Sequence, residues 1–281
     1  MQEFRDRVAV VTGGASGIGL GLASAFAAEG MKLVLADIEA PALDAAVAKL
    51  AAAGADVIGV RTDVSDAAQV QSLADVAVER FGAVHVLCNN AGVGGGGLSW
   101  EAPLDTWEWV LGVNLWGVIN GVRSFVPILM QQPEAHVVNT ASIAGLVAGP
   151  FMGPYNASKH AVVALSETLY HETALMAPRV KVSVLCPGWV RTRIAESARN
   201  RPGATAAEPD AATEGFALAL QPLIDNGMPP EQLAATVLEA IRAERFWILP
   251  HDDTEAFWRT FVDERAQSLV DRSNPTIRAP R

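Results

Sequence analysis

The sequence predicts a doubly wound α/β fold, in which one parallel sheet of seven strands carries helices on both faces. Short apolar runs rich in Val, Ile and Leu alternate with longer helical stretches from residue 7 to residue 250. Nearly all of these runs are continuous, as expected for strands that are covered on both sides. No linker or repeat interrupts the pattern, so we expect residues 1–281 to form a single domain with a core over about 5–250.

Each element of this fold has its own signal in the chain. The seven apolar runs expected as strands are 7–13, 32–37, 56–63, 84–92, 135–142, 181–188 and 245–250. The patterns of 17–30 and 40–54 predict helices that end at a glycine. Residues 66–82 begin with Asp66 and end with Arg80 and a glycine, and this charge distribution suits the helix dipole.

The composition is that of a soluble globular protein with a large core, since half of the 281 residues are hydrophobic and 19% are charged. Acidic residues outnumber basic ones 31 to 21 without a basic run, so we expect no nucleic-acid partner. We find neither a signal-peptide pattern nor an apolar run of membrane-spanning length, which predicts a cytoplasmic protein without a membrane partner. The five histidines lack metal-ligand spacing, so no metal is expected. Cys88 and Cys186 each end an apolar run and are interpreted as core residues, with a disulfide as the alternative.

Ligands of such sheets bind at the carboxyl ends of the strands, so the residues that follow each strand are the candidates for a site. The first strand is followed by TGGASGIG, which contains Gly13, Gly17 and Gly19. Glycines at these positions let backbone amides approach a pyrophosphate at a helix N-terminus. A tight turn without a ligand is the alternative, but the place between the first strand and the first helix favours a dinucleotide cofactor.

Asp37 ends the second strand and indicates which dinucleotide would bind. A carboxylate there can accept hydrogen bonds from the adenosine ribose hydroxyls and repels a 2′-phosphate. No Lys or Arg lies within residues 15–19 or directly after Asp37, so the sequence favours NAD over NADP. The alternative is that Asp37 caps the next helix, and Asp63 after the third strand has the same alternative.

The stretch GPYNASKHAVVAL, residues 153–165, places Tyr155 and Lys159 one helical turn apart on the same face. An exposed pair of this kind carries no chemistry. In a buried pair, the ammonium favours the phenolate and lowers the pKa of the phenol from about 10. The other motifs of the chain indicate whether the pair is exposed or buried.

Five motifs in order closely resemble those of the short-chain dehydrogenase/reductase family: TGGASGIG, NNAG, Asn114, Ser142 and YNASK. The resemblance covers roughly residues 5–250. It implies a Rossmann-type fold and an oxidoreductase that interconverts a secondary alcohol and a ketone with NAD. The intervals from Ser142 to Tyr155 and from Tyr155 to Lys159 fit the family's short branch, with its TGxxxGxG and YxxxK motifs.

This resemblance also implies the site residues. The catalytic set is Asn114, Ser142, Tyr155 and Lys159. The cofactor-binding set runs from the pyrophosphate turn to the nicotinamide loop and comprises Gly13, Ser16, Gly17, Ile18, Gly19, Asp37, Ile38, Asp63, Val64, Asn90, Ala91, Gly92, Tyr155, Lys159, Pro187, Gly188, Val190 and Thr192.

In the mechanism that the resemblance implies, Tyr155 as phenolate takes the proton of the alcohol, or returns it when a ketone is reduced. Lys159 lowers the pKa of Tyr155 and binds the nicotinamide ribose, and Ser142 holds the reacting oxygen. Asn114 holds a water that links Lys159 to solvent. Considered alone, Ser142 could instead cap a strand end, and Asn114 could be a buried structural amide.

Apolar side chains indicate the substrate side, and the candidates are Gly94, Leu146, Met152, Trp189 and Ile194. We expect 92–100, with four consecutive glycines, to be a flexible segment that leaves room for bulk. Residues 192 to about 225 are expected to form a lid. Trp189 packed in the core is the alternative. A shorter resemblance, in 113–127 and 193–202, is to NAD-dependent dehydrogenases of benzylic alcohols from lignin-derived aryl ethers, which favours a hydrophobic or aromatic substrate.

The resemblance further implies a homodimer or homotetramer, because helices over 105–130 and 155–177 form the dimer face in this family. Trp107, Trp109 and Trp116 would add aromatic surface there. Residues 252–281 are expected to form an amphipathic helix and a polar tail. Two other functions stay open: a catalytically silent dinucleotide-binding regulator or scaffold, and an NADP-dependent carbonyl reductase.

Overall fold

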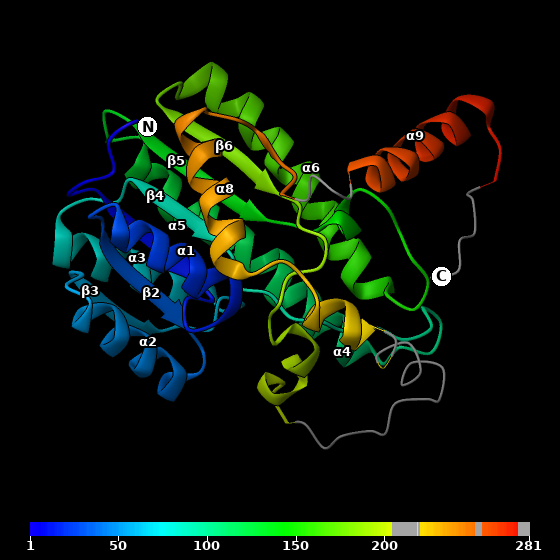
Figure 1. The fold of residues 1–281 in the computed structure, drawn as a ribbon, viewed down its shortest axis with the longest axis horizontal. Coiled ribbons are helices and arrows are strands. Elements are labelled where there is room, and N and C mark those ends of the chain that lie inside the picture. Colours follow the sequence, from blue (N-terminus) through cyan, green and yellow to red (C-terminus); the bar gives the residue numbers. More distant parts are fainter. Residues whose placement is uncertain (204–217, 219, 251–254, 275–281) are drawn as a thin grey trace.

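A computed structural model of the protein describes residues 1–203, 218, 220–250 and 255–274 (Figure 1). The expected lid and the expected C-terminal tail are therefore described only in part, since 204–217, 219, 251–254 and 275–281 lie outside this set. None of the described helices is long and apolar enough to cross a membrane.

The seven expected strands form one parallel sheet in the order β3-β2-β1-β4-β5-β6-β7. The strands are β1 Val8–Thr12, β2 Lys32–Asp37, β3 Val57–Arg61, β4 Val86–Asn89, β5 Ala135–Thr140, β6 Val180–Leu185 and β7 Trp247–Ile248. The fold prediction is confirmed. Most strands end earlier than expected, because the residues after them leave the sheet to form the loops of the site.

The helices cover both faces of the sheet (Figure 1). They are α1 Gly17–Ala28, α2 Ala40–Ala52, α3 Ala67–Phe81, α4 Leu104–Leu111, α5 Gly117–Leu129, α6 Gly153–Met176, α8 Pro230–Arg242 and α9 Glu255–Asp271. One apolar core joins the sheet to α1, α2 and α8 and contains Leu22 and Leu233. A second core on the opposite face joins it to α3, α5 and α6 and contains Leu73 and Phe125.

Local signals explain where these elements begin and end. Asp66 caps α3 by accepting hydrogen bonds from the N–H groups of Ala68 and Gln69, and Gly82 ends the helix at a φ of 76°. Cys88 and Cys186 are both free and buried, as the core interpretation predicts. The helix expected near the C-terminus is present as α9, which extends away from the sheet beyond α6 (Figure 1).

His136 lies inside β5 with no exposed surface, and the fold accepts only its neutral form. Ser183 donates its hydroxyl hydrogen to the carbonyl of Arg245, so the 2.7 Å contact between His136 Nε2 and Ser183 Oγ has to use the Nε2–H. In the described part of the chain, His136 Nδ1 has no hydrogen-bond partner. A second proton on the ring would be buried and unpaired, and burial lowers the pKa of His136 to about 3.

We therefore expect acid to destabilise the protein as the pH falls from 6.5, the ordinary pKa of histidine, towards 3. The stabilising contribution of neutral His136 is complete above pH 6.5. It is lost as the pH falls below 6.5, because His136 takes up a proton in the unfolded chain but not in the folded one. Each pH unit in this window costs about 1.4 kcal/mol. In urea unfolding, His136→Gln should show a shallower pH slope, since its amide can still donate to Ser183. His171→Gln, at an exposed position of α6, should keep the wild-type slope. Equal slopes for all three proteins would contradict the assignment.

Candidate active site

A cavity of about 920 Å³ runs along the carboxyl ends of the strands. Most of the residues expected from the sequence line it: Gly13, Ser16, Gly17, Ile18, Asp37, Ile38, Asp63, Val64, Asn90, Ala91, Gly92, Gly94, Ser142, Met152, Tyr155, Lys159, Pro187, Gly188, Trp189, Val190, Thr192 and Ile194. Gly19, Asn114 and Leu146 stand behind this wall rather than in it. Among the described residues, no three potential metal ligands lie together.

The turn after β1 has the features of a phosphate site. Gly13 and Gly17 adopt φ angles of 65° and 50°, which favour glycine. A Cβ on Gly13 would lie 2.9 Å from Cα of Ala91, so the two loops can approach only with glycine there. Ser16 occupies the N-cap position of α1 without a side-chain cap hydrogen bond, which leaves the first N–H groups of the helix to a ligand. The turn therefore fits a pyrophosphate. A Cβ on Gly19 would overlap the carbonyl of Gly13, so Gly19 shapes the turn from behind.

Asp37 ties this turn to the end of β2. Its Oδ2 accepts a 3.0 Å hydrogen bond from the N–H of Ala15, and its Oδ1 accepts a 3.1 Å bond from the N–H of Glu39. The N-cap position of α2 is Glu39, so Asp37 is not the cap that the alternative interpretation predicts. The Asp37 carboxylate lines the cavity, and each oxygen keeps a lone pair for a ligand.

Asp63 is not the cap of the following helix either, because Asp66 fills that position. The Oδ1 of Asp63 accepts hydrogen bonds from the N–H and the hydroxyl of Ser65, at 2.9 and 2.6 Å. Asn120 of α5 donates to the carbonyl of Val64 at 2.9 Å and fixes the loop from beneath. Both Asp63 and Val64 thus reach the cavity from a fixed loop.

Thr12 is a site residue that the sequence analysis missed. Its hydroxyl oxygen accepts hydrogen bonds from the N–H groups of Asn90 and Ala91, at 2.9 and 3.0 Å. The side-chain amide of Asn90 donates back to the carbonyl of Thr12 at 2.9 Å. These bonds hold the loop after β4 against the glycine turn after β1. A hydroxyl directly before the first glycine is the only sequence signal for this role.

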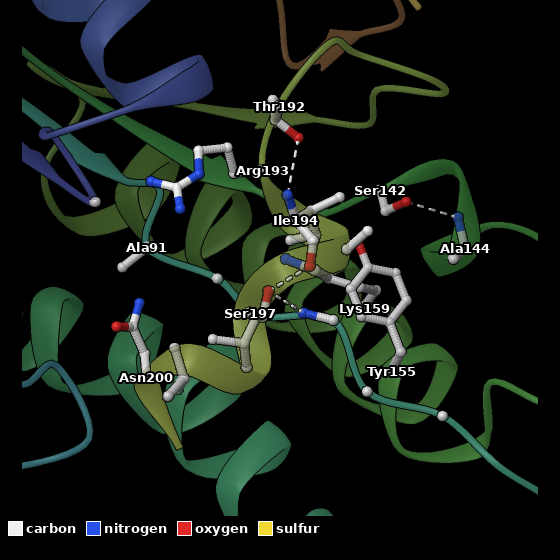
Figure 2. A pocket seen from close by; sticks show the side chains of 18 of the residues that line it. Ala91, Ser142, Ala144, Tyr155, Lys159, Thr192, Arg193, Ile194, Ser197 and Asn200 are labelled. Atoms are coloured by element: carbon white, nitrogen blue, oxygen red, sulfur yellow. Dashed lines mark hydrogen bonds between the residues drawn. The ribbon is translucent and has the colours of Figure 1, made fainter. Parts of the chain in front are cut away.

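Tyr155, Lys159 and Ser142 lie together on the wall of the cavity (Figure 2). The Nζ of Lys159 is 5.6 Å from the centre of the Tyr155 ring and donates to the carbonyl of Thr140 at 3.0 Å. Ser142 Oγ donates to the carbonyl of Pro187 at 3.5 Å. Ser142 Oγ also accepts the N–H of Ala144 at 3.1 Å, so it caps the short turn η2 (Ile143–Gly145) as well.

Burial governs the charges of this cluster. Lys159 is only 3% exposed, and burial lowers its pKa to about 8, so the ammonium is still mostly protonated at neutral pH. Burial also raises the pKa of Tyr155, and the hydrogen bond from Ser142 opposes this rise. The direction differs from the lowering expected from Lys159, because burial disfavours the phenolate and the only opposing contribution comes from Ser142. Any net lowering has to come from positive charge that a ligand brings.

Asn114 is fully buried at the π-helical turn η1 (Gly112–Trp116), between α4 and α5. Its Oδ1 accepts the N–H of Val93 at 2.8 Å, and its Nδ2 donates to the carbonyl of Val93 at 3.0 Å and to Ser158 at 3.2 Å. A Cβ on Gly92 would lie 3.4 Å from Asn114 Oδ1 and 3.6 Å from Lys159 Nζ. Asn114 therefore fixes the backbone beside Lys159, and the expected water remains a prediction.

The comparisons with known proteins agree with this geometry. The family model of the short chain dehydrogenases matches residues 7–203, about two thirds of the chain. The chain belongs to the short-chain dehydrogenase/reductase family. The recognition made from the motifs is thereby confirmed, as is the Rossmann-type fold.

Three members of the family show the range of this likeness. A short-chain dehydrogenase/reductase from Burkholderia phymatum, solved in complex with NAD, is 48% identical and superposes with a TM-score of 0.95 over 100% of both chains. The C alpha-dehydrogenase of Sphingobium is 33% identical over 98% of this chain and 89% of that protein. The 1-deoxy-11-beta-hydroxypentalenate dehydrogenase of Streptomyces exfoliatus is 37% identical over 93% of this chain and 89% of that protein. The chain is thus an oxidoreductase of this family.

The glycine run at 94–97 packs closely against neighbouring segments. A Cβ on Gly95 would overlap Val110 of α4, and a Cβ on Gly96 would overlap the carbonyl of Phe151. The N–H of Gly97 donates to that same carbonyl at 2.8 Å. Residues 92–97 nevertheless line the cavity, so the segment lies beside the site as expected, and its flexibility stays a prediction.

The described part of the expected lid contributes η3 (Ile194–Asn200) to the wall of the cavity. Arg199 contacts Glu39 at 2.7 Å, and Asn200 donates to the same carboxylate at 2.8 Å. The hydrogen bond from Arg199 lowers the pKa of Glu39. At the other side of η3, the N–H of Gly94 donates to Ser197 at 3.0 Å (Figure 2). Residues far apart in sequence thus hold η3 to both edges of the groove.

The substrate side of the cavity is mainly apolar, and Trp189 is 37% exposed rather than packed in the core. Leu146 is not part of this wall, because it packs with the core cluster between α5 and α6. Of the three tryptophans expected at the surface, Trp109 lines the cavity, whereas Trp107 packs next to Gly153. Only Trp116 of these three is largely exposed, at 55%. Further wall residues that the sequence analysis missed are Thr106, Val113, Ile143, Val147, Phe151, Leu220 and Ile224.

Proposed function

We propose that this protein is an NAD-dependent oxidoreductase that interconverts a secondary alcohol and a ketone. One observation carries the proposal: the Ser142, Tyr155 and Lys159 cluster lines the same cavity as the glycine turn after β1. An acid–base group and a dinucleotide bound at these residues would therefore share one cavity. The solved Burkholderia relative, which is in complex with NAD, supports this cofactor for the present chain.

The roles of the chain's own groups follow from their contacts. Tyr155 would remove the hydroxyl proton of the alcohol, or donate a proton to the carbonyl oxygen in the reverse direction. Ser142 would donate a hydrogen bond to the reacting oxygen, and Lys159 would stabilise the phenolate. Asp37 and the N–H groups at the start of α1 would hold the adenosine ribose and the pyrophosphate. Bound NAD would supply the acceptor for the carbinol hydride.

A hydrophobic substrate is supported by the apolar side chains that line the cavity together with Tyr155, which include Met152, Trp189 and Ile194. The relatives named C alpha-dehydrogenase and 1-deoxy-11-beta-hydroxypentalenate dehydrogenase support an organic alcohol that is larger than a simple alkanol. We also infer a homodimer or homotetramer that covers the exposed side chains of Trp116 and of Tyr170, Leu175 and Met176 at the end of α6.

The test is absorbance at the reduced-nicotinamide band, with NAD and a panel of aliphatic, polycyclic and aryl secondary alcohols. We expect a rise with one class of alcohol and no rise with the matched primary alcohols. Normal NAD binding, measured by calorimetry, without turnover of any member of the panel would favour the silent regulator instead. Turnover only with NADP would favour the carbonyl reductase.

A further inference from the structure

One of the cations on the wall of the cavity, Arg201, lies outside the catalytic cluster. Arg201 follows the last residue of η3 and lines the cavity together with Trp109 of α4. Its guanidinium carbon lies 5.9 Å from the centre of the Trp109 ring. In Figure 2, η3 runs from Ile194 in the centre of the view to Asn200 at the lower left, whereas Tyr155 lies at the right. At about 2.0 Å per residue of a 3₁₀-helix, Arg201 comes roughly 14 Å along the chain direction after Ile194.

The other cations that line the cavity also have partners. Lys159 donates to Thr140, Arg199 pairs with Glu39, and Arg193 pairs with Glu196 at 2.6 Å. Arg201 pairs at 2.6 Å with Asp105, whose side chain is 70% exposed at the rim and does not line the cavity. An exposed pair of this kind contributes about 1 kcal/mol or less, so a competing carboxylate can replace it.

The chemistry of Arg201 selects the group that it would bind. A guanidinium has five N–H donors in a planar fork, and this geometry matches a carboxylate. The Trp109 face beside it lowers the local polarity and strengthens a charge-assisted hydrogen bond. Glu101 also lines the cavity, but it is exposed and accepts a hydrogen bond from Trp100 at 3.1 Å. An anionic group that passes this rim therefore meets the Arg201 guanidinium, whose partner carboxylate on Asp105 is exposed to solvent.

We propose that Arg201 binds a carboxylate of the substrate, so that the substrates are hydrophobic hydroxy acids or keto acids whose acid group is remote from the reacting carbon. The inference rests on the proposed function and adds the class of substrate to it. In the free enzyme, Asp105 holds the guanidinium of Arg201 in place, and the substrate carboxylate replaces Asp105 when the substrate binds. The apolar side chains of the same cavity accommodate the chain or ring that joins the two ends of the substrate.

The experiment compares linear secondary hydroxy acids, with the alcohol at increasing distance from the carboxylate, with their methyl esters. Wild-type kcat/KM should favour the acid over its ester at one preferred separation. Arg201→Gln should lower kcat/KM for that acid by roughly 10- to 100-fold, which corresponds to a charge-assisted hydrogen bond, and leave the ester within about twofold. Arg201→Lys should restore part of the preference.

Asp105→Asn separates binding of the substrate from a structural role. Both Asp105→Asn and Arg201→Gln break the same ion pair, so a purely structural pair predicts equal losses for acid and ester in both variants. Our proposal predicts that the two substitutions change kcat/KM for the acid in opposite directions. Asp105→Asn should lower the KM for the acid, because it removes the carboxylate that competes for Arg201. Parallel losses, or an acid preference that survives Arg201→Gln, would overturn the proposal. If wild type oxidises esters and acids equally, only this inference fails; if it oxidises no secondary alcohol, the proposed function fails.

Discussion

Replacing Tyr155 by Phe is expected to lower kcat for a secondary alcohol by roughly 10²- to 10⁴-fold, the usual contribution of a positioned general acid or base. Phe keeps the ring beside Lys159 and removes only the hydroxyl that exchanges a proton with the substrate. NAD binding should stay within about twofold, because the glycine turn and Asp37 are untouched. Initial rates at saturating alcohol and calorimetry with NAD measure the two effects separately.

Tyr170 supplies the matched control for this substitution. It is the chain's other tyrosine and lies on the same helix. It does not line the cavity, and its ring centre lies 4.9 Å from that of Phe246. Tyr170→Phe should therefore retain wild-type kcat. A Tyr155→Phe enzyme that keeps most of its activity would show that another group moves the proton. Equal losses in both variants would point to a disturbed helix instead.

The sheet and its helices could be predicted because their signals are local and repeated. Continuous apolar runs mark strands covered on both faces, and Asp66 with Gly82 marks the two ends of α3. The position of the site could also be predicted, since parallel strands bring their carboxyl ends to one edge. For this reason the residues after β1, β2 and β4 line one cavity, as expected.

Contacts between distant segments could not be predicted in the same way. Arg199 meets Glu39 across 160 residues of sequence, and the charge pattern of neither segment indicates the other. The close packing of Gly95 and Gly96 depends on Val110 and on the backbone of Phe151, so glycine composition alone does not indicate it. The pKa of Tyr155 likewise depends on burial, which the spacing of Tyr and Lys does not report.

The second large effect concerns the choice of dinucleotide: wild-type kcat/KM with NAD should exceed that with NADP by roughly 10²-fold or more. The Asp37 carboxylate would accept a hydrogen bond from the adenosine ribose and repel a 2′-phosphate. Asp37→Ser should lower kcat/KM with NAD by roughly 10-fold, the loss of about one charge-assisted hydrogen bond. It should raise kcat/KM with NADP, because the repulsion disappears. Steady-state kinetics with both dinucleotides give the ratio.

The ion pair between Arg199 and Glu39 is also expected to affect the choice between NAD and NADP. Arg199 approaches the adenosine end through η3, although its partner Glu39 neutralises it. Glu39→Gln in the Asp37→Ser background would free a guanidinium for the 2′-phosphate, so the pair of substitutions should favour NADP more than Asp37→Ser alone. Asp44→Ser removes the same charge from an exposed position of α2 and should leave the ratio unchanged. If the Asp44 variant shifted this ratio as much as Asp37→Ser does, net charge rather than the Asp37 carboxylate would set the preference for NAD. Equal kcat/KM with NAD and NADP in the wild type would contradict the role of Asp37 altogether.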